Sequence, residues 1–278
     1  MPCTRRILAL AMLSVCAGAA TLAAQTTRTD RADALAAAAR RGDAAAVRAL
    51  LDAGVDVNTK FRYSATALSY AADHGHLDVV TLLLEWGADV NVKDTFYGAT
   101  PLTWASGPAQ KRKPEHAAIV GLLLARGATG KEGALLAALS AGDAPMTKVI
   151  LDAGGLPADL LSDALDAAAT GNKPAIASLL EAAGVKRPVE AKLDAAQLAR
   201  YAGTYRSAAG AAGADVTVAV TDGRLVLRTT QTIPLAARSE TVFAAPAQPG
   251  YRVTFTIENG KVVALKSPTA TYTRTGGQ

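Results

Sequence analysis

The side chains best suited to chemistry in this sequence are its three histidines, His74, His76 and His116. Two of them lie in the run Asp73–Asp78, where imidazoles and carboxylates stand close enough in sequence to suggest a divalent metal ion. His76 and His116, however, occupy corresponding positions in two copies of an internal repeat described below. A histidine at this position is expected to form a hydrogen bond between helices. We therefore expect no metal ligands.

Motifs for catalysis and for phosphate binding are absent or incomplete. The sequence contains no Ser-x-x-Lys, Gly-x-Ser-x-Gly or His-Glu-x-x-His. Residues 127–131 read Gly-Ala-Thr-Gly-Lys, but the first glycine of a phosphate loop is missing, and Glu132 stands where Ser or Thr would bind magnesium. The sequence therefore predicts a protein that is not an enzyme, with no catalytic residue and no cofactor.

Residues 1–24 predict export. Arg5 and Arg6 precede an uncharged apolar run at 7–20, and small residues stand before a cleavage site after Ala24. We expect a periplasmic or secreted protein that has no stable membrane insertion once this signal peptide is removed. An uncleaved membrane anchor stays open as an alternative.

Both cysteines, Cys3 and Cys16, lie within this segment, so the mature chain would have no disulfide and no thiolate. Lipid attachment at Cys16 is a second alternative, which the bulky Val15 in front of it disfavours. The formal net charge is +5, of which +3 would remain after cleavage. So small a charge argues against nucleic acid as a partner.

The strongest pattern is a repeat with a period of 33 residues. Gly42 and Gly75 are separated by this interval, as are Gly54 and Gly87. An Asp-Val-Asn turn follows the second glycine of each copy, and weaker copies continue to about residue 187. The pattern predicts units of two short helices and a loop, with left-handed glycines closing the helices. These are Gly42, Gly75, Gly142 and Gly171 for the first helices, and Gly54, Gly87, Gly127 and Gly154 for the second.

Three runs carry a resemblance to the ankyrin repeat family. Thr100–Ala105 matches its Thr-Pro-Leu-His-x-Ala opening with Thr103 in place of His, and Gly75–Val80 and Gly87–Asn91 match the later half of the repeat. The resemblance implies an α-solenoid of about five helix pairs over residues 32–187, after a linker at 25–31 and with a projecting loop missing between the third and fourth units. A basic run at 111–113 is expected to be a solvated loop or a contact to an acidic partner.

After a second linker at 188–193, alternating residues predict an antiparallel β domain over 194–278. Asp222-Gly223 and Asn259-Gly260 are strong hairpin turns. Eight short strands suggest a small β-barrel or half-barrel, so the chain is expected to be an α+β multidomain protein. The run Leu198–Tyr205 and the strands after it resemble the accessory domain of secreted penicillin-binding-protein-like serine hydrolases, which implies a non-catalytic module.

The ankyrin resemblance implies that loop tips and first helices line a concave surface for another protein, whose identity is open, as is the oligomeric state of the chain. Aromatic and arginine side chains are typical of binding hot spots. The expected partner-binding residues are Arg40, Arg41, Arg62, Tyr63, Asp73, His74, Trp86, Phe96, Tyr97 and Arg126. An alternative is that the aromatic residues only pack loop against loop.

A second hypothesis assigns the function to the β domain. Inward aromatic residues such as Tyr205, Phe243 and Phe255 would line an apolar lumen that carries a small hydrophobic ligand, with the repeats as scaffold. A lumen filled by side chains, as expected for a small barrel, would count against it.

Overall fold

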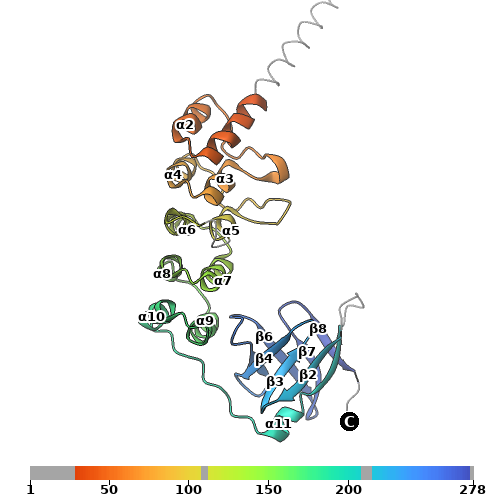
Figure 1. Cartoon of the computed structure of the whole chain (residues 1–278). Helices are drawn as coiled ribbons and strands as arrows, with labels where there is room; N and C mark the ends of the chain where they lie inside the picture. The colour runs from red at the N-terminus through yellow and green to blue at the C-terminus, as the bar shows by residue number, and fades with distance from the viewer. Residues whose placement is uncertain (1–28, 108–111, 208–214, 276–278) are drawn as a thin grey trace, which may run out of the picture. The chain divides into compact units, whose positions relative to one another are not determined.

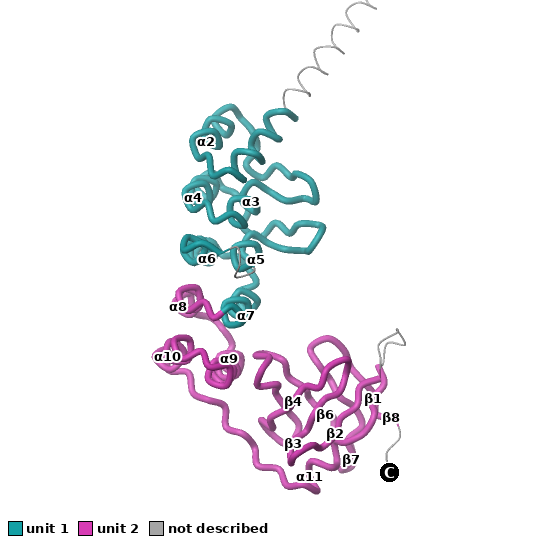
Figure 2. The backbone as a smooth tube through the Cα atoms, in the orientation of Figure 1, with its two compact units in different colours: residues 1–141 teal, residues 142–278 magenta. Residues whose placement is uncertain are grey.

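The computed structural model describes residues 29–107, 112–207 and 215–275. The expected signal peptide and both cysteines lie outside these residues. The chain divides into two compact units, residues 1–141 and 142–278 (Figure 2). The expected domain limits, 32–187 and 194–278, stay predictions. Among the described residues, no helix is both long and apolar enough to cross a membrane.

The first unit consists of short helices in two rows (Figure 1). Its helical segments are residues 29–41, α2 (Ala44–Asp52), η1 (Arg62–Ser64), α3 (Ala67–His74), α4 (Leu77–Glu85), α5 (Pro101–Ala105), α6 (Glu115–Ala125) and α7 (Lys131–Ala141). The first helices of the repeats, α3, α5 and α7, form one row, and the second helices, α2, α4 and α6, form the other. Alanine, leucine and valine side chains fill most of the space between them.

Histidines join successive repeats in this unit. His76 Nε2 donates to the carbonyl of Arg40 at 3.0 Å, and His116 Nε2 lies 3.3 Å from the carbonyl of Asp73. The expectation of hydrogen bonds between helices is thereby confirmed for both. Gly42, at φ 75°, is required beside His76, because a Cβ there would lie 2.5 Å from the imidazole.

The Asp-Val-Asn turns hold the projecting loops in register. Asp56 Oδ1 accepts from the backbone N–H of Asn58, and Asp89 Oδ1 accepts from that of Asn91. Each asparagine also reaches the next repeat: Asn58 Oδ1 accepts from Asp89 N at 2.8 Å, and Asn91 Oδ1 from Thr129 N at 2.9 Å. The tight turns are confirmed, and their side chains also link neighbouring repeats.

Two loops project from the side of α3 and α5 (Figure 1): the first loop, residues 53–66, and the second loop, residues 86–100. Only residues 126–130 separate α6 from α7, so the expected absence of a projecting loop there is confirmed. One predicted helix end is wrong. Gly171 has φ −81° and the left-handed position belongs to Asn172, at φ 52°, because asparagine tolerates that conformation.

The second unit contains further helices and a closed antiparallel barrel in which each strand pairs with its neighbours in sequence. The helices are α8 (Ala144–Asp152), α9 (Ala158–Thr170), α10 (Pro174–Ala182) and α11 (Ala195–Ala199). The strands are β1 (Gly203–Ser207), β2 (Val216–Thr221), β3 (Arg224–Arg228), β4 (Thr232–Ala237), β5 (Val242–Ala244), β6 (Arg252–Glu258), β7 (Lys261–Lys266) and β8 (Thr271–Thr275). Because β1 also pairs with β8, the barrel is closed, which confirms the barrel over the half-barrel.

The barrel encloses an aromatic core. Tyr201, Tyr205, Phe243 and Phe255 are almost fully buried, and their ring centroids lie 4.9–5.9 Å apart in four contacts. Tyr205 donates its hydroxyl to the carbonyl of Tyr201 at 2.6 Å. Burial, partly offset by the charge of Arg274 and reinforced by Tyr201, raises the pKa of Tyr205 to about 12. These inward rings contact one another, which is the filled interior expected of a small barrel.

Candidate functional site

Four aromatic side chains gather where the first and second loops meet. The ring centroids of Tyr63 and Phe96 are 5.0 Å apart, those of Phe96 and Tyr97 are 4.5 Å apart, and Tyr97 is 5.8 Å from Trp104. We call these four residues the aromatic cluster. Tyr63, Phe96 and Tyr97 are nevertheless 47%, 60% and 72% exposed, so the rings both pack loop against loop and face solvent. The packing of loop against loop is confirmed, and partner binding by the exposed ring surfaces stays a prediction.

The backbone of the first loop is strained beneath the cluster. Tyr63 has φ 58° and ψ 29°, and Ser64 has φ 58°, a left-handed conformation that is costly for side chains with a Cβ. The carbonyl of Tyr63 accepts from Thr95 N at 2.8 Å, so the second loop holds the first in this conformation. Strained residues of this kind concentrate at functional sites.

A buried carboxylate shapes the second loop. Asp94, 5% exposed, accepts from the backbone N–H groups of Phe96 at 2.9 Å, Tyr97 at 2.6 Å and Ala99 at 3.1 Å, and from the indole Nε1 of Trp104 at 3.1 Å. Burial raises the pKa of this carboxyl group, but the four hydrogen bonds together outweigh burial and hold the pKa below its ordinary value of 3.8. Sequence reasoning missed Asp94, although an Asp two residues before an aromatic pair in a turn is a usable signal.

Arginines lie over two of the neighbouring rings. The Arg62 guanidinium carbon is 4.7 Å from the Tyr63 ring centroid, and its Nη2 donates to the Tyr63 hydroxyl at 2.8 Å. The Arg40 guanidinium carbon is 3.7 Å from the centroid of Tyr70, a ring that the sequence analysis did not select. These cation–π contacts fix the arginines against the first-helix side of the repeats. Arg41 is exposed next to Arg40.

Asp73 and His74 stand at the end of α3. His74 is exposed, and its Nδ1 lies 2.9 Å from the carbonyl of Tyr70 and 3.6 Å from Asp73 Oδ2. The rings of His74 and His76 stack at 6.0 Å. Among the described residues no group of three histidine, cysteine or acidic side chains could hold a metal ion.

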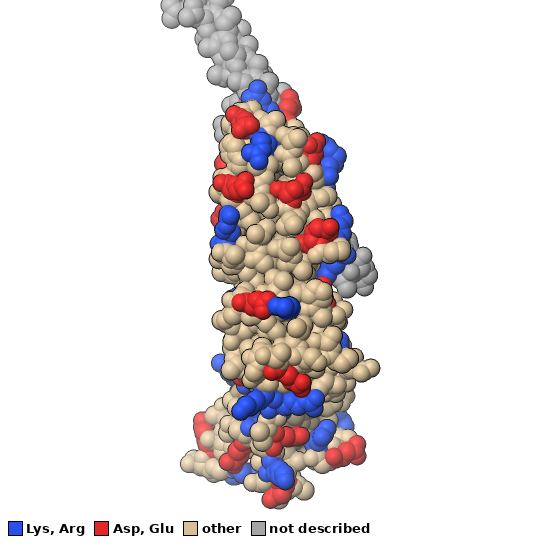
Figure 3. Space-filling view, turned by 90° about the vertical axis from the view of Figure 1, so that its left-hand side faces the viewer, with Lys and Arg blue, Asp and Glu red and all other residues tan. Residues whose placement is uncertain are grey.

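Two of the selected residues lie elsewhere. Trp86 and Arg126 end the second helices α4 and α6, so they belong to the other row of helices. Arg126 Nη1 donates to the carbonyl of Leu84 at 3.0 Å, because the last carbonyls of a helix need donors from outside it. Their expected place on the first-helix surface is therefore wrong. On the second-helix side, acidic and basic side chains are scattered among uncharged ones (Figure 3), so charge does not single out a binding surface there.

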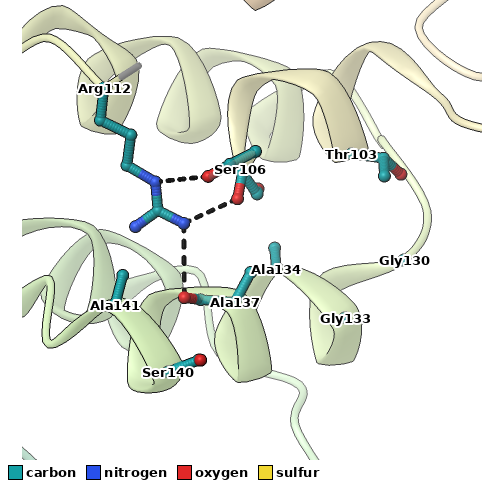
Figure 4. Close-up of a pocket in the computed structure, with 10 residues that line it drawn as sticks. Thr103, Ser106, Arg112, Gly130, Gly133, Ala134, Ala137, Ser140 and Ala141 are labelled. Atoms are coloured by element: carbon teal, nitrogen blue, oxygen red, sulfur yellow. Dashed lines mark hydrogen bonds between the residues drawn. The ribbon is translucent and has the colours of Figure 1, made fainter. Parts of the chain in front are cut away.

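A surface pocket of about 580 Å³ lies between α5 and α7. Small side chains and glycines line most of it (Figure 4), including Gly133, Ala134 and Ala137. Arg112 Nη2 donates to the carbonyl of Ser106 at 2.7 Å and to that of Ala137 at 3.3 Å. The expectation that the whole basic run is solvated is wrong at Arg112, which is partly buried. Its neighbour Lys111 lies outside the described residues.

Comparisons with known proteins agree with this geometry. Residues 9–94 match a family model described as ankyrin repeats (3 copies). The repeats are ankyrin repeats. The ankyrin pattern of paired helices continues in α5 and α6, beyond the matched residues. Ankyrin repeats present extended surfaces to other proteins, so the match supports a protein-interaction scaffold in general.

Residues 187–277 match a second family model, described as Domain of unknown function (DUF3471). The barrel is this domain. The resemblance to an accessory domain of penicillin-binding-protein-like hydrolases gains no support from the match and stays a prediction. A search of curated proteins finds no match for the chain.

Proposed function

We propose that this chain is an exported, non-enzymatic scaffold that binds another protein through the aromatic cluster and the arginines beside it. The observation that carries the proposal is the exposure of Tyr63, Phe96 and Tyr97 on two loops that hydrogen bonds hold in place. Large rings with few torsions bury much area on binding and lose little entropy. The buried Asp94 orders the loop before a partner arrives, which lowers the cost of association.

The surface that we assign to the partner runs from the cluster along the first helices. It includes Arg62 and Tyr63 of the first loop, Phe96 and Tyr97 of the second loop, and Arg40 against Tyr70. Arg41, Asp73 and His74 stand at its margin. Recognition by this surface would make and break no covalent bond, in keeping with the absence of acyl-enzyme motifs from the sequence.

Export forms part of the proposal and rests on residues 1–24 of the sequence. Cleavage after Ala24 would leave a chain without cysteine, which suits an oxidising compartment such as the periplasm. Mass spectrometry of the protein from its native envelope tests this directly. An N-terminus at Gln25 is the expected result, and an intact segment at 1–24 would contradict it.

The binding surface is tested by crosslinking in the native envelope, followed by affinity measurements on the partner so identified. We expect the double variant Tyr63→Ala/Tyr97→Ala to weaken binding at least tenfold at unchanged thermal stability, because both rings are exposed. Trp86→Ala is the matched control, since Trp86 is also an exposed aromatic residue but ends a second helix. Equal affinity of the double variant and the wild type would refute the assigned surface.

A second candidate function follows from a pocket of about 320 Å³ at the barrel. Leu225, Leu235 and Phe243 line it together with the segment 190–193, so a small hydrophobic ligand could enter there even though the inward rings fill the core. A thermal shift with fatty acids or other apolar ligands that Leu235→Trp abolishes would favour the carrier. No shift with any of them would leave the scaffold as the proposal.

A further inference from the structure

Three aspartates share one face of α9. Asp159, Asp163 and Asp166 follow one another at intervals of four and three residues, so their side chains stand above one another on the helix. Like charges at this spacing repel each other and weaken an isolated helix. Asp163 is also only 3% exposed, and a buried carboxylate is stable only when cations or hydrogen-bond donors face it.

The cations come from the barrel. Arg252, at the start of β6, donates through Nε to Asp163 Oδ2 at 2.9 Å, and its Nη1 lies 3.0 Å from Asp159 Oδ2. Arg238, directly after β4, donates through Nη2 to Asp166 Oδ2 at 3.0 Å, and its Nε is 3.6 Å from Asp163 Oδ1. Two arginines thus face three carboxylates.

The contact is buried at Asp163 and Arg238 and open to water at Asp159, whose side chain is 56% exposed. The side chain of Arg238 is 10% exposed and that of Arg252 is 28% exposed. Leu160 of α9 approaches Gly250 closely, since a Cβ added to this glycine would lie 3.1 Å from Leu160 Cδ1. Salt screens the buried pairs around Asp163 only weakly.

We propose that the barrel is a docking module for an acidic helix face, and that its occupant in this chain is α9. Docking fixes the barrel to the last helix pair and keeps this first-helix face of the repeats closed to other proteins. The barrel thereby has a function of its own, separate from the aromatic cluster: it acts as an intramolecular partner of the repeats. The connecting segment contributes a single backbone bond to a strand in the described residues, Ala191 N to Ala237 O at 2.9 Å.

The test measures the distance between spin labels in the full chain. Labels are placed at Ser178→Cys on α10 and Glu258→Cys on β6, both exposed positions, with Cys3 and Cys16 replaced by serine. We expect a narrow distance distribution in this protein and a distribution at least twice as broad in Arg238→Ala/Arg252→Ala. The matched control is Arg206→Ala, which removes an exposed arginine that pairs with Asp215 within the barrel, and should leave the distribution narrow.

A broad distribution in the protein with both arginines would overturn the proposal, as would an unchanged narrow one in the double variant. Circular dichroism establishes that the barrel of the double variant is folded. If it is not, the helix-side variant Asp159→Asn/Asp166→Asn decides, because both carboxylates are more exposed than Asp163. This variant should broaden the distribution too, and a distribution as narrow as in the parent would contradict the docking model. The affinity of the aromatic cluster for its partner is not expected to change, which separates this outcome from that of the proposed function.

Discussion

Replacement of Asp94 should collapse the second loop. In Asp94→Ala, four hydrogen bonds to a carboxylate are lost at once, from three backbone N–H groups and one indole. The amides of Phe96 and Tyr97 can regain water at the loop tip, whereas Ala99 is buried and its N–H would have no acceptor. Phe96 and Tyr97 would then leave the positions from which they contact Tyr63 and Trp104.

The expected change in the free energy of unfolding follows from the hydrogen bonds that each variant loses. A hydrogen bond to a charged group contributes about 1.5–3 kcal/mol, but recovered hydration offsets part of the sum, so we expect Asp94→Ala to lower the free energy of unfolding by about 3 kcal/mol. Oδ1 accepts from Phe96 and Tyr97, and Oδ2 from Ala99 and Trp104. Asp94→Asn can keep the first pair and turns an NH2 group toward the second, so it should cost about half as much.

Urea unfolding monitored by tryptophan emission measures this change, because the indole of Trp104 bonds to Asp94 directly. The folded-state pKa of Asp94 is lowered, so its contribution is present above pH 3.8 and is lost as the pH falls through the folded value. The advantage of the wild type over Asp94→Asn should therefore shrink in acid. Equal unfolding curves at pH 7, or an advantage that persists unchanged in acid, would refute this reasoning.

Two further predictions concern the repeats and the barrel. In urea unfolding, Gly42→Ala should lower the free energy of unfolding by about 3 kcal/mol and Gly87→Ala by about 1 kcal/mol. Both glycines have a left-handed φ, but only Gly42 faces a side chain, because an added Cβ would lie 2.5 Å from the ring of His76. Equal costs would contradict this packing. Tyr205 has a raised folded-state pKa of about 12, so its stabilisation is full below pH 10.0 and is lost as the pH rises toward 12. Tyr205→Phe should lower the free energy of unfolding by about 1 kcal/mol at pH 7. Its stability, followed by circular dichroism, should fall less steeply with rising alkaline pH than that of the wild type. An unchanged pH profile would count against the buried phenol.

Much of the fold could be predicted because its signals are local. The interval of 33 residues places a left-handed glycine at the end of successive helices, and the Asp-Gly and Asn-Gly pairs fix two hairpins of the barrel. The inter-helix histidines followed from repeat register, since His76 and His116 occupy corresponding positions in two units although they are 40 residues apart. Gly171 departs from the prediction because the neighbouring Asn172 can adopt the left-handed conformation as well.

The candidate site was predictable only in part. Repeat register identified Tyr63, Phe96 and Tyr97 as loop-tip residues, but their mutual contacts depend on how two loops meet. Register also grouped Trp86 and Arg126 with them, and the structure places both at the ends of second helices. The sequence pattern gives the position of a residue within the repeat. It does not give the direction in which a side chain at a helix end points.

By itself, the sequence determined the repeat, the strands and the turns of this protein, because glycine conformations, caps and alternating burial act between residues close in the chain. The tertiary structure alone decided which distant charges and rings meet. Asp94 accepts the hydrogen bonds that order the second loop, and the aspartates of α9 bind arginines more than seventy residues away in the sequence. Such contacts depend on burial and on close packing, which arise only when separate elements come together in space.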